Sequence, residues 1–239
     1  MMQRVFDLLF SSLALLLLAP LLLPLLLLLR FTGEGEVFYR QQRIGRGGVT
    51  FGLLKFATML KNSPNLGTGT VTLHGDPRVL PVGRFLRATK LNELPQLFNI
   101  LKGDMSLIGP RPQTQRCFDA FPEAARQDII KVRPGLSGIG SIVFRDEARL
   151  LADADDADAV YDGLIMPHKG ALEQWYVRRQ GLGLYFALIA LTVWVVLRPG
   201  SALIDRLFKD LPVPPPALAA LMQQDGAGAL QAAAEKQDA

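Results

Sequence analysis

The sequence predicts an α+β, membrane-associated protein. Residues 8–29 carry no charge and are mostly leucine, and about 20 apolar residues suffice to cross a bilayer. Residues 36–59 have the composition of two strands around the glycine-rich turn 45–48. Apolar side chains recur at helical spacing over residues 91–101, and residues 182–197 form a second uncharged run. These patterns indicate a small mixed domain between two apolar segments.

Positive charge is concentrated in the first half of the chain. The 239 residues have a formal charge of +4, yet the segment from Arg30 to Arg116 holds 13 lysines and arginines against 5 aspartates and glutamates, a net +8. Such a segment suits an anionic membrane face or phosphate ligands. No nucleic-acid-binding module is recognisable, so nucleic acid is not an expected partner. The single Cys117 excludes an internal disulfide and fits a reducing compartment.

Residues 1–31 are expected to form a membrane helix that is kinked at Pro20 and Pro24, because each proline removes a backbone hydrogen bond. Arginines flank the apolar run on both sides, with Arg4 before it and Arg30 after it. A hairpin that enters and leaves on the cytoplasmic face satisfies the positive-inside rule, whereas a straight span leaves the orientation ambiguous. A plain kinked transmembrane helix is the alternative.

The stretch 84–112 organises the rest of the chain, and it reads RFLRATKLNELPQLFNILKGDMSLIGPRP. Asn92 is a good N-cap and Pro95 is tolerated in a first turn, so a helix is expected to begin at Asn92 and to end at Gly103. Exposed amides and the helix dipole then favour an anion beside Asn92 and Glu93. Arg111 lies between two prolines, in a stiff loop suited to a bidentate grip on phosphate.

This stretch closely resembles the core signature of the bacterial sugar transferases, the monotopic phosphoglycosyl transferases. About thirty residues match in register, including Leu-Pro-Gln-Leu, Lys-Gly-Asp-Met-Ser and Gly-Pro-Arg-Pro. The resemblance implies transfer of a sugar 1-phosphate from a nucleotide-diphosphate sugar, expected to be UDP-linked, to a polyprenyl phosphate. It also implies a catalytic domain facing the cytoplasm at the bacterial inner membrane, where the product starts surface glycan assembly, and a re-entrant N-terminal helix.

The resemblance also implies roles for individual residues. Glu93 matches the metal-binding acid of the family, and Glu93 with Asp104 is expected to hold a Mg²⁺ ion that bridges the donor's phosphates. For Asp104, a structural cap after the helix is the alternative. Substrate binding is expected from the remaining matched positions, which are Lys55, Arg87, Arg111, Pro112 and Arg133.

Two positions depart from the family pattern. Asn92 stands where the family has its nucleophilic Asp, and Ala57 stands where a Lys-Phe-Arg-Thr-Met motif has its Arg. An amide is neutral and a poor nucleophile. Three interpretations stay open: the lipid phosphate attacks the donor directly while Asn92 orients phosphate, Glu93 becomes the catalytic nucleophile, or the chain is an inactive membrane scaffold of a glycan-assembly complex. The otherwise intact site favours a variant enzyme.

The remaining segments complete the predicted architecture. Residues 32–180 are expected to form the cytoplasmic domain, with a helix over 114–131 that is interrupted at Pro122. Residues 181–200 are expected to form a C-terminal helix at the membrane interface, with a second crossing as the alternative. The tail 201–239 is rich in Pro, Ala and Gln and is expected to be weakly ordered. Oligomeric state stays open, and a homodimer is one of the states considered.

Overall fold

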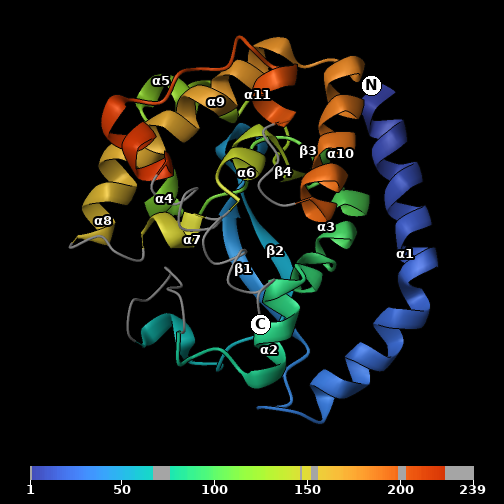
Figure 1. Ribbon diagram of the computed structural model, residues 1–239. Coiled ribbons are helices and arrows are strands. Elements are labelled where there is room, and N and C mark those ends of the chain that lie inside the picture. Colours follow the sequence, from blue (N-terminus) through green and yellow to red (C-terminus); the bar gives the residue numbers. More distant parts are fainter. Residues whose placement is uncertain (1, 67–75, 146, 152–155, 199–202, 224–239) are drawn as a thin grey trace, which may run out of the picture.

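The computed structural model in Figure 1 describes residues 2–66, 76–145, 147–151, 156–198 and 203–223. It confirms a mixed fold of helices and strands. The helices are α1 (Met2–Arg30), α2 (Pro81–Ala88), α3 (Gln96–Lys102), α4 (Gln115–Asp119), α5 (Glu123–Ile129), α6 (Ile139–Val143), α7 (Glu147–Leu150), α8 (Ala157–Val160), α9 (Met166–Arg179), α10 (Leu182–Leu197) and α11 (Leu203–Leu207). The strands are β1 (Phe38–Ile44), β2 (Thr50–Phe56), β3 (Ser106–Ile108) and β4 (Gly135–Ser137).

Two strand pairs lie at the centre of the domain. β1 and β2 form the predicted antiparallel hairpin, with Phe38 opposite Phe56 and Ile44 opposite Thr50. Its turn contains Gly47 and Gly48 at φ of 72° and 74°, a conformation that glycine adopts without steric cost. β3 and β4 pair in parallel, with Ile108 beside Ser137. The parallel pair brings the loop after residue 108 next to the segment before residue 138.

The helix α1 runs along one side of the domain (Figure 1) and continues through Pro20 and Pro24. Figure 1 shows that its last turns run at an angle to the first ones, as expected for proline kinks. Leu16 and Leu17 in its middle are 72% and 69% exposed. Among the described residues, α1 is the one helix long and apolar enough to cross a membrane by length and composition.

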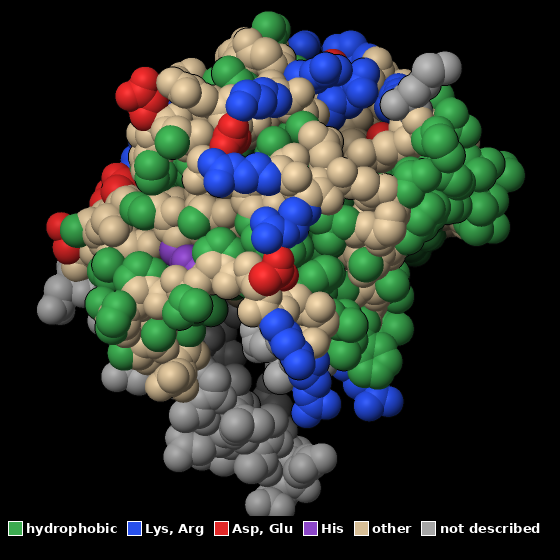
Figure 2. Space-filling model, turned by 90° about the horizontal axis from the view of Figure 1, so that it is seen from above, with side chains coloured by type: hydrophobic (Ala, Val, Ile, Leu, Met, Phe, Trp, Pro, Cys, Tyr) green, Lys and Arg blue, Asp and Glu red, His purple; other side chains and the backbone are tan. Residues whose placement is uncertain are grey.

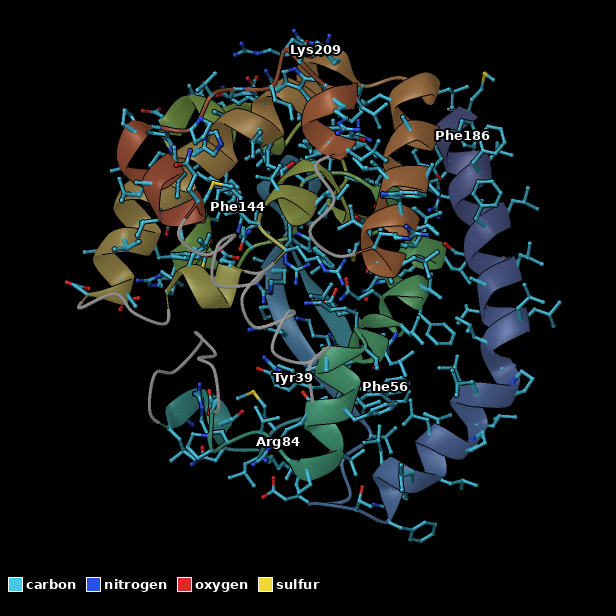
Figure 3. The ribbon with its side chains drawn as sticks, in the orientation of Figure 1. Tyr39, Phe56, Arg84, Phe144, Phe186 and Lys209 are labelled. Carbon is cyan, nitrogen blue, oxygen red and sulfur yellow. The ribbon has the colours of Figure 1, made fainter. Side chains whose placement is uncertain are left out.

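The second apolar helix, α10, has the bounds predicted from its uncharged run. One face is buried, with Leu188 and Leu191 at 0% and 2% exposure, whereas Leu197 is 73% exposed. Phe186 points toward α1 (Figure 3) and makes edge contacts with Phe6, at 4.9 Å between ring centroids. α10 therefore packs between the domain core and the first turns of α1.

The main core forms around α9. Ile165, Met166 and Leu172 are fully buried there, and α5 packs across the same helix. Pro122 separates α4 from α5, as predicted, and Thr114 caps α4 by accepting a hydrogen bond from the backbone N–H of Cys117 at 3.3 Å. The domain thus rests on contacts between segments far apart in the sequence.

The expected helix start at Asn92 is wrong in detail. Leu91–Glu93 form a 3₁₀ turn that follows Lys90 at φ 60°, and α3 begins only after Pro95. The amides of Glu93 and Leu94 donate to backbone carbonyls three residues earlier, so they do not need a side-chain cap. Gly103, at φ 99°, ends α3 as predicted.

The expectation of a weakly ordered tail also needs correction. Residues 203–223 pack on the domain: Leu218 is fully buried, and Phe208 meets Trp175 edge to face at 5.4 Å. Asp210 accepts a hydrogen bond from the Trp175 indole at 3.2 Å and pairs with Arg179 at 2.9 Å. A few widely spaced apolar side chains are enough to pack this segment against the domain. The overall composition of the segment does not predict this packing. Residues 224–239 lie outside the described residues.

Candidate active site

The centre of the candidate site is an ion pair between Glu93 and Arg111. The Arg111 guanidinium donates to Glu93 Oε1 at 2.9 Å. Glu93 is the last residue of the 3₁₀ turn and Arg111 follows β3, so the pair joins two parts of the predicted signature. The Arg111 side chain keeps 35% of its surface exposed and that of Glu93 keeps 14%, so a ligand can reach the pair.

Neighbouring charges and burial shift the pKa values of Glu93 and of Lys55. Burial raises the pKa of Glu93, but the charges of Arg111 and Lys55 outweigh burial and hold this pKa at about 2. Burial lowers the pKa of Lys55 to about 7, a shift that Glu93 opposes and that Arg43 and Arg111 reinforce. Glu93 is therefore ionised at neutral pH, whereas Lys55 is close to its titration point and gains its charge readily beside an anion.

Arg43 is a site residue that the sequence analysis missed as such. Its guanidinium donates to the backbone carbonyl of Pro112 at 3.2 Å and to Gln41 Oε1 at 2.6 Å. Among the described residues its buried Nε has no hydrogen-bond partner. The alternation of side chains along β1 was the available signal, because Arg43 lies on the same face as Tyr39, which pairs with Lys55. Pro112 thus holds Arg43 beside Arg111.

Asn92 directly precedes Glu93 in the sequence and is 7% exposed. Within the described part of the chain, its buried Oδ1 accepts no hydrogen bond. An unpartnered buried amide oxygen costs free energy, and such groups need an explanation of their own. We call Arg43, Lys55, Asn92, Glu93 and Arg111 the Arg111 cluster.

Arg87 lies at the margin of the site. Its guanidinium donates to the Thr58 hydroxyl at 3.4 Å, and Thr58 directly follows Ala57, the second departure from the family pattern. Burial lowers the pKa of Arg87, but an arginine stays charged at any working pH. Ala57 is apolar and 7% exposed, so this position carries no charge in place of the Arg of the family motif.

The loop that carries Arg111 is fixed by its backbone. Gly109 donates to the Ser137 carbonyl at 3.0 Å, and Gly135 donates to the Pro110 carbonyl at 2.8 Å. The Tyr176 hydroxyl donates to the Ile108 carbonyl at 3.1 Å. A side chain at Gly109 would collide with the facing backbone, which explains the glycine. The guanidinium is therefore presented by a rigid loop.

Glu173 lies on the opposite side of the same loop and was not predicted. It is 1% exposed, and its Oε1 accepts from the Arg111 backbone N–H at 3.4 Å. Its buried Oε2 has no hydrogen-bond partner among the described residues. Burial raises the pKa of Glu173 to about 8, against the opposing effects of the Arg111 N–H and of Lys169. Glu173 is therefore protonated at neutral pH.

Two predicted residues lie elsewhere. Asp104 accepts from the Asn99 side-chain amide at 3.2 Å and pairs with Lys102 at 3.2 Å. The Arg133 Nε donates to the Gly103 carbonyl at 2.8 Å, at the end of α3. In the described ranges no group of three or more His, Cys, Asp or Glu side chains could hold a metal ion. Of the two predicted metal ligands, Glu93 alone contacts the Arg111 guanidinium.

Asp76 and Arg78 form a buried ion pair with a structural role. Both carboxylate oxygens of Asp76 accept from the Arg78 guanidinium, the closest at 2.6 Å, and both side chains are buried. Arg78 also donates to the Ser63 carbonyl at 2.9 Å. The pair closes the loop before α2.

A rigid arginine, several further cations and one ionised carboxylate, on a domain with a long apolar helix, indicate an enzyme that handles phosphate esters at a membrane. The chain belongs to the bacterial sugar transferase family, whose model matches residues 1–199.

Three curated relatives illustrate the similarity. The exopolysaccharide production protein ExoY of Sinorhizobium fredii is 39% identical over 159 residues, which are 61% of this chain and 70% of the relative. The undecaprenyl-phosphate galactose phosphotransferase of Salmonella typhimurium is 33% identical over 84% of this chain and 41% of the relative. The UDP-glucose:undecaprenyl-phosphate glucose-1-phosphate transferase of Caulobacter vibrioides is 40% identical over 59% of this chain and 53% of the relative.

Proposed function

We propose that the protein transfers a sugar 1-phosphate from a nucleotide-diphosphate sugar to a polyprenyl phosphate and so starts the assembly of a surface glycan. The observation that carries the proposal is the Arg111 cluster, which gathers cations around one accessible carboxylate. The names of the relatives, which include two undecaprenyl-phosphate sugar phosphotransferases, support the same reaction. They also support a UDP-linked donor.

The cations have a direct task in this reaction. Donor and acceptor bring several negative charges together, and catalysis of phosphoryl transfer consists largely of positioning and neutralising them. Arg111 and Arg43 supply fixed charge, while Lys55, with a pKa of about 7, gains its proton as the anionic donor binds. Arg87 adds a further cation at the margin.

Magnesium fits this site through Glu93. Mg²⁺ is commonly held by one or two carboxylates together with substrate phosphates, so a single ionised carboxylate beside the donor suffices. Glu93 meets that requirement inside the Arg111 cluster, whereas Asp104 lies outside the cluster and contacts Asn99 and Lys102. Bound there, the metal ion would neutralise charge on the donor's phosphates.

Asn92 favours direct transfer. An oxygen of the lipid phosphate attacks the phosphorus that bears the sugar, a new P–O bond forms, and the P–O bond to the nucleotide breaks so that a nucleoside monophosphate leaves. The amide cannot replace Asp as a nucleophile, but the side chain can orient a phosphate from the edge of the Arg111 cluster. Glu93 as the nucleophile is the alternative, with a covalent intermediate on its carboxylate.

Both ends of α1 support a re-entrant membrane helix at the cytoplasmic face of the inner membrane. At its first turns, Asp7 Oδ1 accepts from the Leu107 amide at 3.0 Å, whereas Leu29 at the other end is buried against Phe56 and Leu86. A helix that crosses about 30 Å of hydrocarbon would place its ends on opposite sides of the bilayer. Here one polar domain contacts both ends, which supports a helix whose two ends lie on the same side of the bilayer.

The test uses purified full-length protein, a panel of nucleotide sugars and polyprenyl phosphate. Release of a nucleoside monophosphate that depends on the lipid and on Mg²⁺ is expected with at least one donor. Under direct transfer, labelled donor leaves no label on the protein without acceptor, while Asn92→Asp permits a labelled species. Label on the unaltered chain that Glu93→Gln removes would instead assign the nucleophile to Glu93.

The scaffold interpretation makes the opposite prediction. It expects no release with any donor and no loss of cellular glycan when Lys55, Glu93 or Arg111 becomes Ala. A transferase loses glycan with each of these variants. The exposed Arg116 on α4 provides the control, because Arg116→Ala removes an arginine outside the Arg111 cluster.

A further inference from the structure

A second basic site lies at the N-terminal end of α1, separate from the Arg111 cluster. A cavity of about 260 Å³ opens there between the first turns of α1, the end of β3 and the segment after α5. Its charged lining consists of Arg4, Arg46, Lys131 and Arg133 with Asp7. We call this cavity the α1-end pocket, and none of its described lining residues belongs to the Arg111 cluster.

The positive charge of the α1-end pocket is poorly compensated. Arg4 and Arg133 donate to the backbone carbonyls of Leu101 and Gly103 at the end of α3, which are neutral partners. Arg46 has no acidic partner within the described residues. Asp7 is the one acid that lines the pocket, and it is 2% exposed.

The carboxylate of Asp7 already accepts hydrogen bonds from uncharged donors. Asp7 Oδ1 accepts from Ser106 Oγ at 2.9 Å, from the Leu107 amide at 3.0 Å and from the Tyr185 hydroxyl at 3.0 Å. Lys131 pairs with Asp128 at 2.6 Å but keeps 64% of its side chain exposed. The pocket therefore retains an excess of positive charge that suits an anion.

The surroundings identify the kind of anion. Immediately after Asp7, Leu8 and Leu9 are 39% and 56% exposed on α1, and Val5 is 60% exposed beside them. Figure 2 shows Lys and Arg side chains gathered on the face seen from above, next to a large hydrophobic surface. A ligand with a phosphate and an apolar chain matches both the basic pocket and the exposed apolar surface of α1. A free phosphate would contact only the basic pocket.

We propose that the α1-end pocket binds the phosphate headgroup of an anionic phospholipid, with the acyl chains lying along the exposed leucines of α1. The cavity is smaller than the roughly 300–1,000 Å³ of sites for drug-sized ligands, which fits a headgroup better than a nucleotide sugar. Basic residues beside a membrane segment attract anionic lipids electrostatically. The proposal depends on membrane association but not on the transfer reaction, and it gives Arg133 a lipid contact in place of a substrate contact.

The test measures lipid binding to the full-length protein in mild detergent by native mass spectrometry. Phosphatidylglycerol and phosphatidylcholine with identical acyl chains are titrated separately, and phosphatidylglycerol is expected to bind at least tenfold more tightly. The variant R46A/K131A removes two exposed charges and leaves Arg4 and Arg133, which hold the end of α3, in place. It is expected to weaken phosphatidylglycerol binding at least tenfold.

A matched control is R206A/K209A, which removes two exposed charges from the segment around α11, outside the pocket lining. Its phosphatidylglycerol affinity is expected to stay within twofold of the unaltered chain, and R46A/K131A is expected to keep its nucleoside monophosphate release in saturating polyprenyl phosphate. Equal losses of phosphatidylglycerol affinity in both variants would show that binding depends on general surface charge, and this result would overturn the proposal. Efficient competition by inorganic phosphate would overturn it too, because the site would then take free phosphate.

Discussion

Glu93 and Glu173 are two carboxyl groups on opposite sides of one arginine, Glu93 partly exposed and Glu173 buried, and they differ in charge state. Glu93 faces the Arg111 guanidinium, and its pKa falls to about 2 although burial alone would raise it. Glu173 faces the Arg111 backbone N–H, and burial raises its pKa to about 8. A full positive charge within 3 Å outweighs desolvation, whereas one long hydrogen bond from an amide does not.

The difference separates two tasks of the same loop. On the guanidinium side, the ionised Glu93 is available to a metal ion or a reacting group. On the backbone side, the neutral Glu173 packs against Gly140 and contributes to the shape of the core. The same residue type is thus ionised on one side of the loop and neutral on the other.

The largest expected effect comes from exchanging each carboxylate for an amide. Glu93→Gln removes a charge and should lower nucleoside monophosphate release at least 100-fold, the usual scale for one preorganised electrostatic group. Glu173→Gln keeps the shape and neutrality of a protonated acid and should stay within threefold at pH 7. Steady-state rates with saturating donor and lipid measure both. Equal losses in the two variants would contradict the division of tasks.

The second effect concerns stability and pH. Glu173 has a folded-state pKa near 8, above the value of about 4.5 for an unfolded chain, so its contribution is present below pH 4.5 and is lost as pH rises through 8. Relative to Glu173→Gln, the unaltered chain should lose about 3 kcal/mol between pH 5.5 and 8, or roughly 6–12 °C in Tm. Thermal unfolding in detergent at both pH values measures the difference, and parallel curves would contradict it.

The third effect tests the charge beside Glu93. Free Lys55 has a pKa of about 7, so the protonated form that attracts a diphosphate declines above that pH. The value of kcat/KM should therefore fall about tenfold from pH 7 to pH 8.5, because this ratio reports the free enzyme. In Lys55→Arg the charge persists, and the decline should disappear. A fall that is identical in both proteins would assign it to another group.

The smallest effect should come from the backbone side of the loop. Tyr176→Phe removes the hydrogen bond to the Ile108 carbonyl at 3.1 Å and should cost about 1 kcal/mol of unfolding free energy. Release activity should change less than threefold, since Gly109 and Gly135 still hold the loop. A large activity loss without a stability change would instead connect Tyr176 directly to the Arg111 guanidinium.

Local patterns in the sequence were sufficient for much of the fold. The bounds of α10, the hairpin turn at Gly47 and Gly48, and the break at Pro122 follow from short stretches whose side chains determine their own backbone. The start of α3 was harder, because i to i+3 backbone bonds around Leu94 compete with a side-chain cap. Boundaries of this kind depend on small free-energy differences that composition does not reveal.

The candidate site was predicted in part. The family resemblance over residues 84–112 predicted that Glu93 and Arg111 belong to one site, and the two side chains form an ion pair. Glu173 was missed because it lies 62 residues from Arg111 and its neutral state arises only from burial in the folded core. Arg133 was grouped with the substrate residues, although the parallel pairing of β3 and β4 directs it to the end of α3.

The contact between Asp7 and Tyr185 joins residues 178 positions apart. Since the ribosome makes the chain from its N-terminus, α1 emerges before every partner of its first turns has been synthesised. Asp7 can meet Ser106 and Leu107 earlier, but its hydrogen bond to Tyr185 forms only after α10 has been made. The first helix of the chain is therefore completed by one of the last helices, so its final hydrogen bond is delayed by most of the chain's synthesis.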